Sequence, residues 1–190
     1  MMFSQAAIAS NPAFARRVGA VVVGSLLLTL SAKVQVPFYP VPMSMQSFVA
    51  IGLGLAFGSR LGAAAVFAYL LQGAAGLPVF ASAHGAGFGY LFGPTGGYLV
   101  GFLLAAIVAG GLKDWAQGRI ARLAGVSLLA SMVLYVPGLA WLGGFTGYGK
   151  ELFLAGAAPF LLGDALKTVL LATAFGPTAK LLSNQTESDR

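Results

Sequence analysis

Long apolar stretches separated by short polar breaks dominate the chain. Six of them are expected to form transmembrane helices: Val18–Val36, Met43–Phe57, Leu61–Ala75, Thr95–Leu112, Ala121–Leu142 and Pro159–Phe175. The second and third hold about 15 residues each, which span roughly 22 Å, less than the ~30 Å hydrocarbon core of a bilayer. This pair is therefore expected either to extend into its flanks or to form a partial hairpin.

The composition supports a membrane location for this pattern. The chain is 58% hydrophobic and only 8% charged, and its mean hydropathy is +0.86. A soluble domain usually carries about 25% charged residues, so this chain cannot cover a water-facing surface. We expect an all-α integral membrane protein with one domain over residues 1–190. Residues 1–17 lack the pattern of a removable signal peptide.

The basic residues predict how the helices are oriented. With six crossings, eight of them fall on one side of the membrane and two on the other. The first group comprises Arg16, Arg17, Arg60, Lys113, Arg119, Arg122, Lys180 and Arg190, and the second comprises Lys33 and Lys150. Because Lys and Arg concentrate in cytoplasmic loops, both termini are expected in the cytoplasm, with residues 183–190 as a flexible tail. Three longer loops, Lys33–Pro42, Gly76–Phe92 and Gly143–Ala158, then lie outside.

The last apolar stretch contains an acid and a base, Asp164 and Lys167. Residues three apart share one face of a helix, and either charge alone would cost roughly 2.5–3.5 kcal/mol in a bilayer. Such a pair indicates a functional site by default, although it could also serve only as a buried ion pair that fixes helix packing. Both residues lie roughly 8–12 Å below the outer end of their helix. This depth predicts an outward-facing pocket capped by the three long loops.

Other segments offer candidate ligand contacts, each with a structural alternative. The stretch Gly76–Tyr90 combines four glycines with Phe80, His84, Phe88 and Tyr90, which suits either a ring-binding loop or a flexible loop with incidental aromatics. Gln46 could recognise an amide-like group or bond to another helix.

Glycines near the fourth and first helices predict close contacts. The run Gly93–Phe102 (GPTGGYLVGF) places Gly96, Gly97 and Gly101 in a groove that another helix, or a ligand, could approach. Tyr98 in the same run adds a hydrogen-bonding group. Ala20 and Gly24 form a small-xxx-small pattern suited to contact within the bundle or with a partner.

Several function classes find no support in the sequence. There is no cysteine and only one histidine, so no thiolate chemistry, disulfide or metal site is expected. The scattered basic residues do not suggest nucleic-acid binding. Residues 144–151 approach a phosphate-binding loop but place Glu151 where Ser or Thr should hold magnesium. An intramembrane enzyme using Asp164 and Lys167 remains an alternative, without a nucleophile or cofactor.

Taken together, these motifs resemble the BioY family, the biotin-binding S components of energy-coupling factor (ECF) transporters. The resemblance rests on Gly76–Phe80 with the glycine-rich run after it, Gly93–Phe102, Gly163–Lys167 and Val41–Gln46. In the last of these, Ser44 stands where the family usually has Thr. The resemblance implies a six-helix bundle with an outward pocket for biotin in the bacterial cytoplasmic membrane. It also implies no enzymatic activity or cofactor, because a transmembrane coupling protein and two ATPase subunits would supply energy.

The resemblance also implies roles for the candidate residues. Asp164 would accept hydrogen bonds from the ureido ring, and Lys167 would donate to the ureido carbonyl or the carboxylate. Phe80, Phe88 and Tyr98 would enclose the apolar rings, and Ala20 and Gly24 would contact the coupling protein. No Lys or Arg lies between Arg60 and Lys113, so His84, loop N–H groups or Lys167 would have to bind the carboxylate. An S component for thiamin or riboflavin is the alternative, and assembly into homo-oligomers stays open.

Overall fold

The computed structural model describes residues 12–81, 86–116 and 119–188, with side chains described as far as residue 176. The helices are α2 (Pro12–Lys33), α3 (Gln46–Ala74), α4 (Phe88–Leu91), α5 (Gly96–Ala116), α6 (Ile120–Thr146), α7 (Lys150–Gly156) and α8 (Ala158–Ser188). Two short strands, β1 (Gln35–Val36) and β2 (Met43–Ser44), join α2 to α3.

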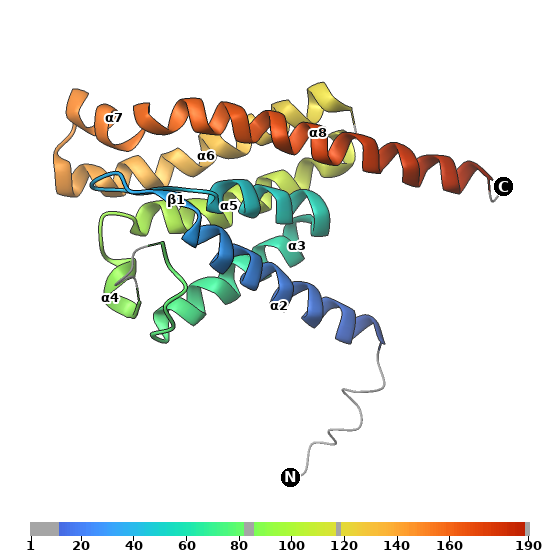
Figure 1. Cartoon of the computed structure of the whole chain (residues 1–190), viewed down its shortest axis with the longest axis horizontal. Coiled ribbons are helices and arrows are strands. Elements are labelled where there is room, and N and C mark those ends of the chain that lie inside the picture. Colours follow the sequence, from blue (N-terminus) through green and yellow to red (C-terminus); the bar gives the residue numbers. More distant parts are fainter. Residues whose placement is uncertain (1–11, 82–85, 117–118, 189–190) are drawn as a thin grey trace, which may run out of the picture.

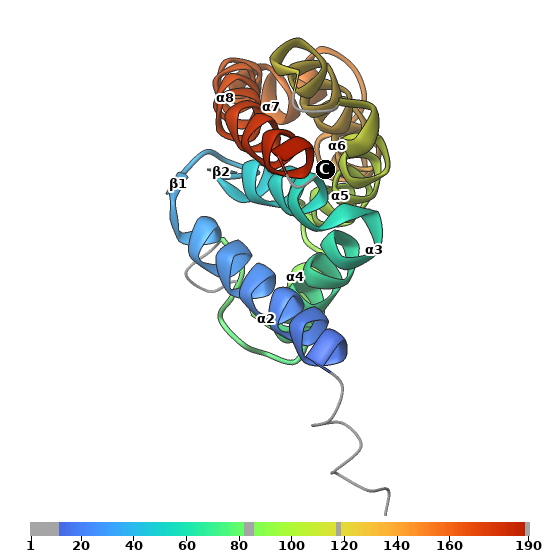
Figure 2. The same ribbon diagram turned by 90° about the vertical axis from the view of Figure 1, so that its right-hand side faces the viewer.

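Five of these helices, α2, α3, α5, α6 and α8, are long and apolar enough to cross a membrane. The chain is therefore a multi-pass membrane protein. Figure 1 shows these helices packed side by side, with α2 and α8 at the edges of the bundle. Seen from the end in Figure 2, α3 and α5 lie between them.

Helix α3 is interrupted at Gly58, whose backbone has φ 81° and ψ 172°. This left-handed φ favours glycine and reverses the chain. The two halves then lie against each other, since a Cβ on Gly62 would sit 3.0 Å from the Gly54 Cα. Gln46 Nε2 also donates to Tyr69 Oη across the halves, at 2.5 Å. α3 is thus a helical hairpin that turns where the sequence places Gly58-Ser59-Arg60.

The connection between α2 and α3 departs from the all-helical expectation. β1 and β2 pair antiparallel, with Gln35 opposite Ser44 and Val36 opposite Met43. The first helix therefore ends at Lys33 rather than at Val36, and the second begins at Gln46 rather than at Met43. Figure 2 shows β1 and β2 at the flank between α2 and α8, so an extended segment closes this side of the bundle.

The ends of α8 and the loops also differ from the sequence-based bounds. α8 continues through Gly176 and Pro177 to Ser188, although these residues were expected to end it after Phe175. A proline inside a helix removes one backbone bond, and Leu171 and Ala172 remain buried just before it. Short helices α4 and α7 form within the Gly76–Phe92 and Gly143–Ala158 loops.

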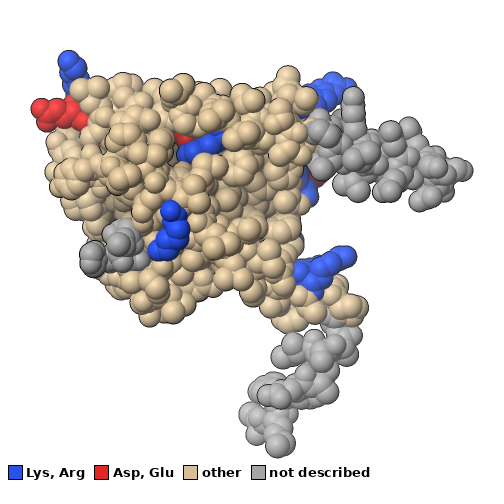
Figure 3. All heavy atoms as spheres, viewed as in Figure 1, with Lys and Arg blue, Asp and Glu red and all other residues tan. Residues whose placement is uncertain are grey.

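Charged side chains are distributed unevenly over the surface. Figure 3 shows basic side chains gathered at the end where α2 begins and α8 leaves the bundle. The same view shows acidic and basic atoms side by side within a broad, mostly uncharged area. Asp164 and Lys167, the pair that the sequence singles out, are each only 9% exposed.

Candidate substrate-binding site

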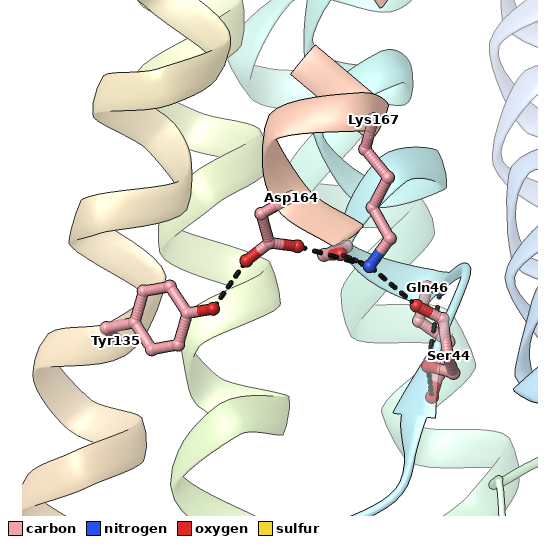
Figure 4. Close-up of polar contacts among 6 residues, drawn as sticks. Ser44, Gln46, Tyr135, Asp164 and Lys167 are labelled. Carbon is pink, nitrogen blue, oxygen red and sulfur yellow. Dashed lines mark hydrogen bonds and ion pairs between the residues drawn. The ribbon is translucent and has the colours of Figure 1, made fainter. Parts of the chain in front are cut away.

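Asp164 and Lys167 form a buried ion pair on α8. Lys167 Nζ lies 3.1 Å from Asp164 Oδ1, and each residue is only 9% exposed. The same ammonium donates to the Ser44 carbonyl and to Ser47 Oγ, both at 2.9 Å. An ammonium has three donors, so all three are engaged by described residues. Figure 4 shows how the lysine joins α8 to β2 and the start of α3.

Tyr135 on α6 is a third member of this site. Its hydroxyl donates to Asp164 Oδ2 at 2.5 Å, from the side opposite Lys167 (Figure 4). Both carboxylate oxygens therefore have a partner. Sequence reasoning missed Tyr135 because it lies 29 residues from Asp164. A signal was available, since a tyrosine within an apolar membrane segment needs a hydrogen-bond partner when buried.

Two small cavities lie beside this cluster. The first, of about 50 Å³, is lined by Val41, Pro42, Met43, Ser44, Ser47, Tyr98, Phe102, Leu134, Tyr135, Phe160, Asp164 and Lys167. The second, of about 30 Å³, shares five of these residues and adds Gln46, Ala81, Tyr90, Thr95 and Leu99. Ligand sites usually measure roughly 300–1,000 Å³, so neither cavity alone is large enough for a typical ligand.

Gln46 and Tyr98, both singled out from the sequence, come together at the second cavity. Ser44 Oγ donates to Gln46 Oε1 at 3.0 Å, and Gln46 donates in turn to Tyr69. Tyr98 Oη donates to the Gly156 carbonyl at 2.7 Å. The Tyr98 ring also lies edge-on to Tyr135, with centroids 6.3 Å apart. Tyr98 therefore stands between the two cavities.

The other predicted aromatic contacts lie elsewhere. Phe80 is fully buried and stacks on Tyr90 at 4.8 Å, with Tyr69 edge-on at 5.4 Å. Phe88 on α4 is 64% exposed and lies beside Phe92. Neither ring lines the two cavities. His84 lies outside the described residues.

The two small residues predicted to face a partner differ in position. Gly24 is buried against α3, where an added Cβ would lie 2.7 Å from the Ala65 Cβ. This glycine therefore serves contact within the bundle. Ala20 is half-buried, and the neighbouring Gly19 is exposed.

The glycines of α5 also serve helix packing. A Cβ added at Gly97 would lie 3.0 Å from the Pro137 carbonyl carbon, and one at Gly101 would lie 3.1 Å from the Leu134 Cα. The predicted groove is therefore filled by α6 rather than by a ligand. This close approach fixes the α6 backbone on both sides of Tyr135.

Comparison with known proteins shows one family of relatives that match most of this chain. The BioY family model matches residues 4–184. A "Probable biotin transporter BioY" of Pyrococcus horikoshii is 36% identical over 80% of this chain and 90% of its own length. The "Biotin transporter BioY" of Thermotoga maritima is 37% identical, over 77% of this chain and 85% of its own.

The fold also resembles a solved structure. The S-component for biotin from an ECF-type ABC transporter superposes with a TM-score of 0.76 at 22% identity. The match covers 90% of this chain and 94% of that one. Together with the family match over nearly the whole sequence, this likeness leads to one conclusion: the chain is a member of the BioY family.

Proposed function

We propose that this protein is the substrate-specific subunit of an ECF-type transporter that binds biotin and takes it up across the cytoplasmic membrane of a bacterium. The observation that carries the proposal is the buried Asp164–Lys167 pair, joined by Tyr135, at the side of a cavity with apolar walls. The names of the relatives from Pyrococcus horikoshii and Thermotoga maritima point to the same substrate.

The chemistry of biotin suits this site. Its ureido ring carries two N–H donors, and a carboxylate has about four lone-pair sites, of which Asp164 uses two. The remaining sites of Asp164 accept from the ureido ring. Phe102, Leu134 and Phe160 supply apolar surface for the thioether ring. Gln46 and Tyr98 line the second cavity, which shares part of its wall with the first.

The carboxylate tail of biotin needs partners at the outer end of the site. Lys167 already donates all three of its N–H groups to described residues, so it suits this role less well. Backbone N–H groups of the outer loops and His84 then hold the carboxylate. Phe80 and Phe88 lie in the same loop region, and they contact the substrate there only if that region rearranges.

Biotin binding requires the site to open. The two cavities of about 50 and 30 Å³ share Val41, Pro42 and Ser44 as a common wall. These residues belong to the segment that contains β2, between α2 and α3. Movement of this segment joins the two cavities into one pocket and admits the substrate from outside.

The membrane topology that we propose has six crossings. The two halves of α3, on either side of Gly58, each count as one, and α2, α5, α6 and α8 supply the others. The basic end of the molecule in Figure 3 then faces the cytoplasm together with both termini, and the Asp164 site opens outward.

The partners implied by this role are a transmembrane coupling protein and two ATPase subunits. The side of α2 that is turned away from α3 is available to the coupling protein. It includes Gly19, where an added Cβ meets no described atom within 4 Å. The half-buried Ala20, one turn before Gly24, lies nearer to α3 and borders this side. Gly24 lies on the other side of α2, where the absence of a side chain allows α2 to pack closely against α3.

Substitutions on α2 distinguish contact with the coupling protein from packing against α3. Gly19→Leu is expected to leave biotin binding and thermal stability unchanged, but to weaken assembly with the coupling protein and reduce uptake. Gly24→Leu is expected to cost about 1–3 kcal/mol of stability, because it overpacks the α2–α3 contact. Co-purification with the coupling protein and thermal unfolding of each variant test this. Equal effects of the two variants on stability would contradict the assignment.

Uptake of radiolabelled biotin into proteoliposomes tests the function directly. The complete transporter is expected to accumulate biotin in the presence of ATP, with no competition from thiamin or riboflavin, and to release it chemically unchanged. Competition by thiamin or riboflavin would identify a different vitamin as the substrate. Conversion of the bound ligand would instead identify an intramembrane enzyme.

A further inference from the structure

The hydroxyl of Tyr135 presents only an acceptor to the substrate cavity. A phenol has one O–H donor, and Tyr135 uses it on Asp164 Oδ2 at 2.5 Å. The ring lines the 50 Å³ cavity, and the α6 backbone on either side of it is held against Gly97 and Gly101 of α5. The phenolic oxygen is therefore fixed in place, with lone pairs left to accept a hydrogen bond.

The neighbouring groups complete a defined pattern of donors and acceptors. Asp164 keeps two of its lone-pair sites, while the ammonium of Lys167 has no unused donor among the described residues. Ser47 Oγ accepts from Lys167, which leaves its own proton to donate into the cavity that it lines. The site thus offers two acceptors, Asp164 and Tyr135, and one hydroxyl donor backed by a positive charge.

This pattern complements a cyclic urea, which has two N–H donors and one carbonyl acceptor. We propose that Tyr135 is a specificity-determining residue whose phenolic oxygen accepts one ureido N–H while Asp164 accepts the other and Ser47 donates to the carbonyl. The inference rests on the proposed binding of biotin and adds the basis for its selectivity. Ring compounds without the N–H pair, such as lactones or dithiolanes, are rejected because Asp164 and Tyr135 would stay unpaired.

A thermodynamic cycle that combines altered ligands with the Tyr135→Phe variant tests this inference. The probes are biotin and its two cyclic carbamate analogues, in each of which a ring oxygen replaces one ureido N–H. Leaving a buried group unpaired costs about 1–3 kcal/mol, so the purified protein is expected to bind each analogue about tenfold more weakly than biotin. Tyr135→Phe is expected to bind biotin about tenfold more weakly as well.

The decisive result is the behaviour of Tyr135→Phe toward the two analogues. The analogue without the N–H that faces Tyr135 is expected to lose no further affinity, whereas the other analogue is expected to lose about tenfold again. A purely structural role would weaken all three ligands equally, and that result would overturn the inference. Tyr148→Phe, an exposed site beyond the end of α6, is the matched control and is expected to behave as the parent.

The parent protein provides an independent check. If the parent binds biotin and both carbamates with equal affinity, the site recognises neither ureido N–H group. The inference then fails, while the proposed function stands. If the folded parent binds none of the three ligands, the proposed function itself fails.

Discussion

Lys167→Met is expected to abolish biotin binding and to lower the stability of the protein. The substitution leaves the Asp164 carboxylate buried without its cation, and breaking such a pair from one side costs about 3–5 kcal/mol. It also deprives the Ser44 carbonyl and Ser47 Oγ of their donor, so β2 loses its link to α8. Thermal unfolding in detergent and equilibrium binding of radiolabelled biotin measure the two effects.

The double variant Asp164→Asn with Lys167→Met separates a binding site from a structural ion pair. Removing both charges is expected to restore much of the lost stability, because no uncompensated charge stays buried. Binding is expected to remain absent, because the carboxylate acceptor is gone. A stable double variant that binds biotin as tightly as the parent would show that the Asp164–Lys167 pair has only a structural role. Lys150→Met, at the exposed start of α7, is the control.

Gly97→Val is expected to destabilise the bundle and to weaken biotin binding together. The new side chain would meet the Pro137 carbonyl and the Trp141 Cβ, where α5 and α6 are in closest contact. Overpacking of this kind costs about 1–3 kcal/mol. Since Tyr98 follows on α5 and Tyr135 precedes Pro137 on α6, separating the helices also displaces two residues that line the cavity.

Gly111→Val provides the matched control for this prediction. Gly111 lies on the same helix, and a Cβ there meets no described atom within 4 Å. Both substitutions change helix propensity alike, so a difference in unfolding temperature reports the α5–α6 contact. Equal losses in the two variants would show that the glycine contact contributes nothing specific.

The parts of the fold that the sequence predicts best are those governed by local patterns. Apolar length identifies the long helices, and the Gly58 turn appears where Gly58-Ser59-Arg60 breaks two short apolar runs. The Asp164–Lys167 pair is also a local feature, because residues three apart share a helix face. Charge inside an apolar helix is rare enough to identify a candidate site without any structure.

Features that depend on long-range contacts were missed or misplaced. Tyr135 reaches Asp164 only once α6 packs on α8, and no spacing rule joins residues on separate helices. The pattern of Ala20 and Gly24 left contact within the bundle and contact with a partner both open, and only packing shows that Gly24 faces Ala65. The residues of β1 and β2 were predicted to belong to the neighbouring helices. A strand of two residues is too short to show an alternating pattern of apolar and polar positions.

Titration calorimetry of the purified protein with biotin tests the central claim most directly. A saturable one-to-one complex, lost in Asp164→Asn and in the double variant Asp164→Asn with Lys167→Met while both variants remain folded, is the predicted result. Failure of the folded parent to bind biotin would contradict the assignment of biotin as substrate. Undiminished binding by Asp164→Asn would contradict the assignment of the Asp164 cluster as its site.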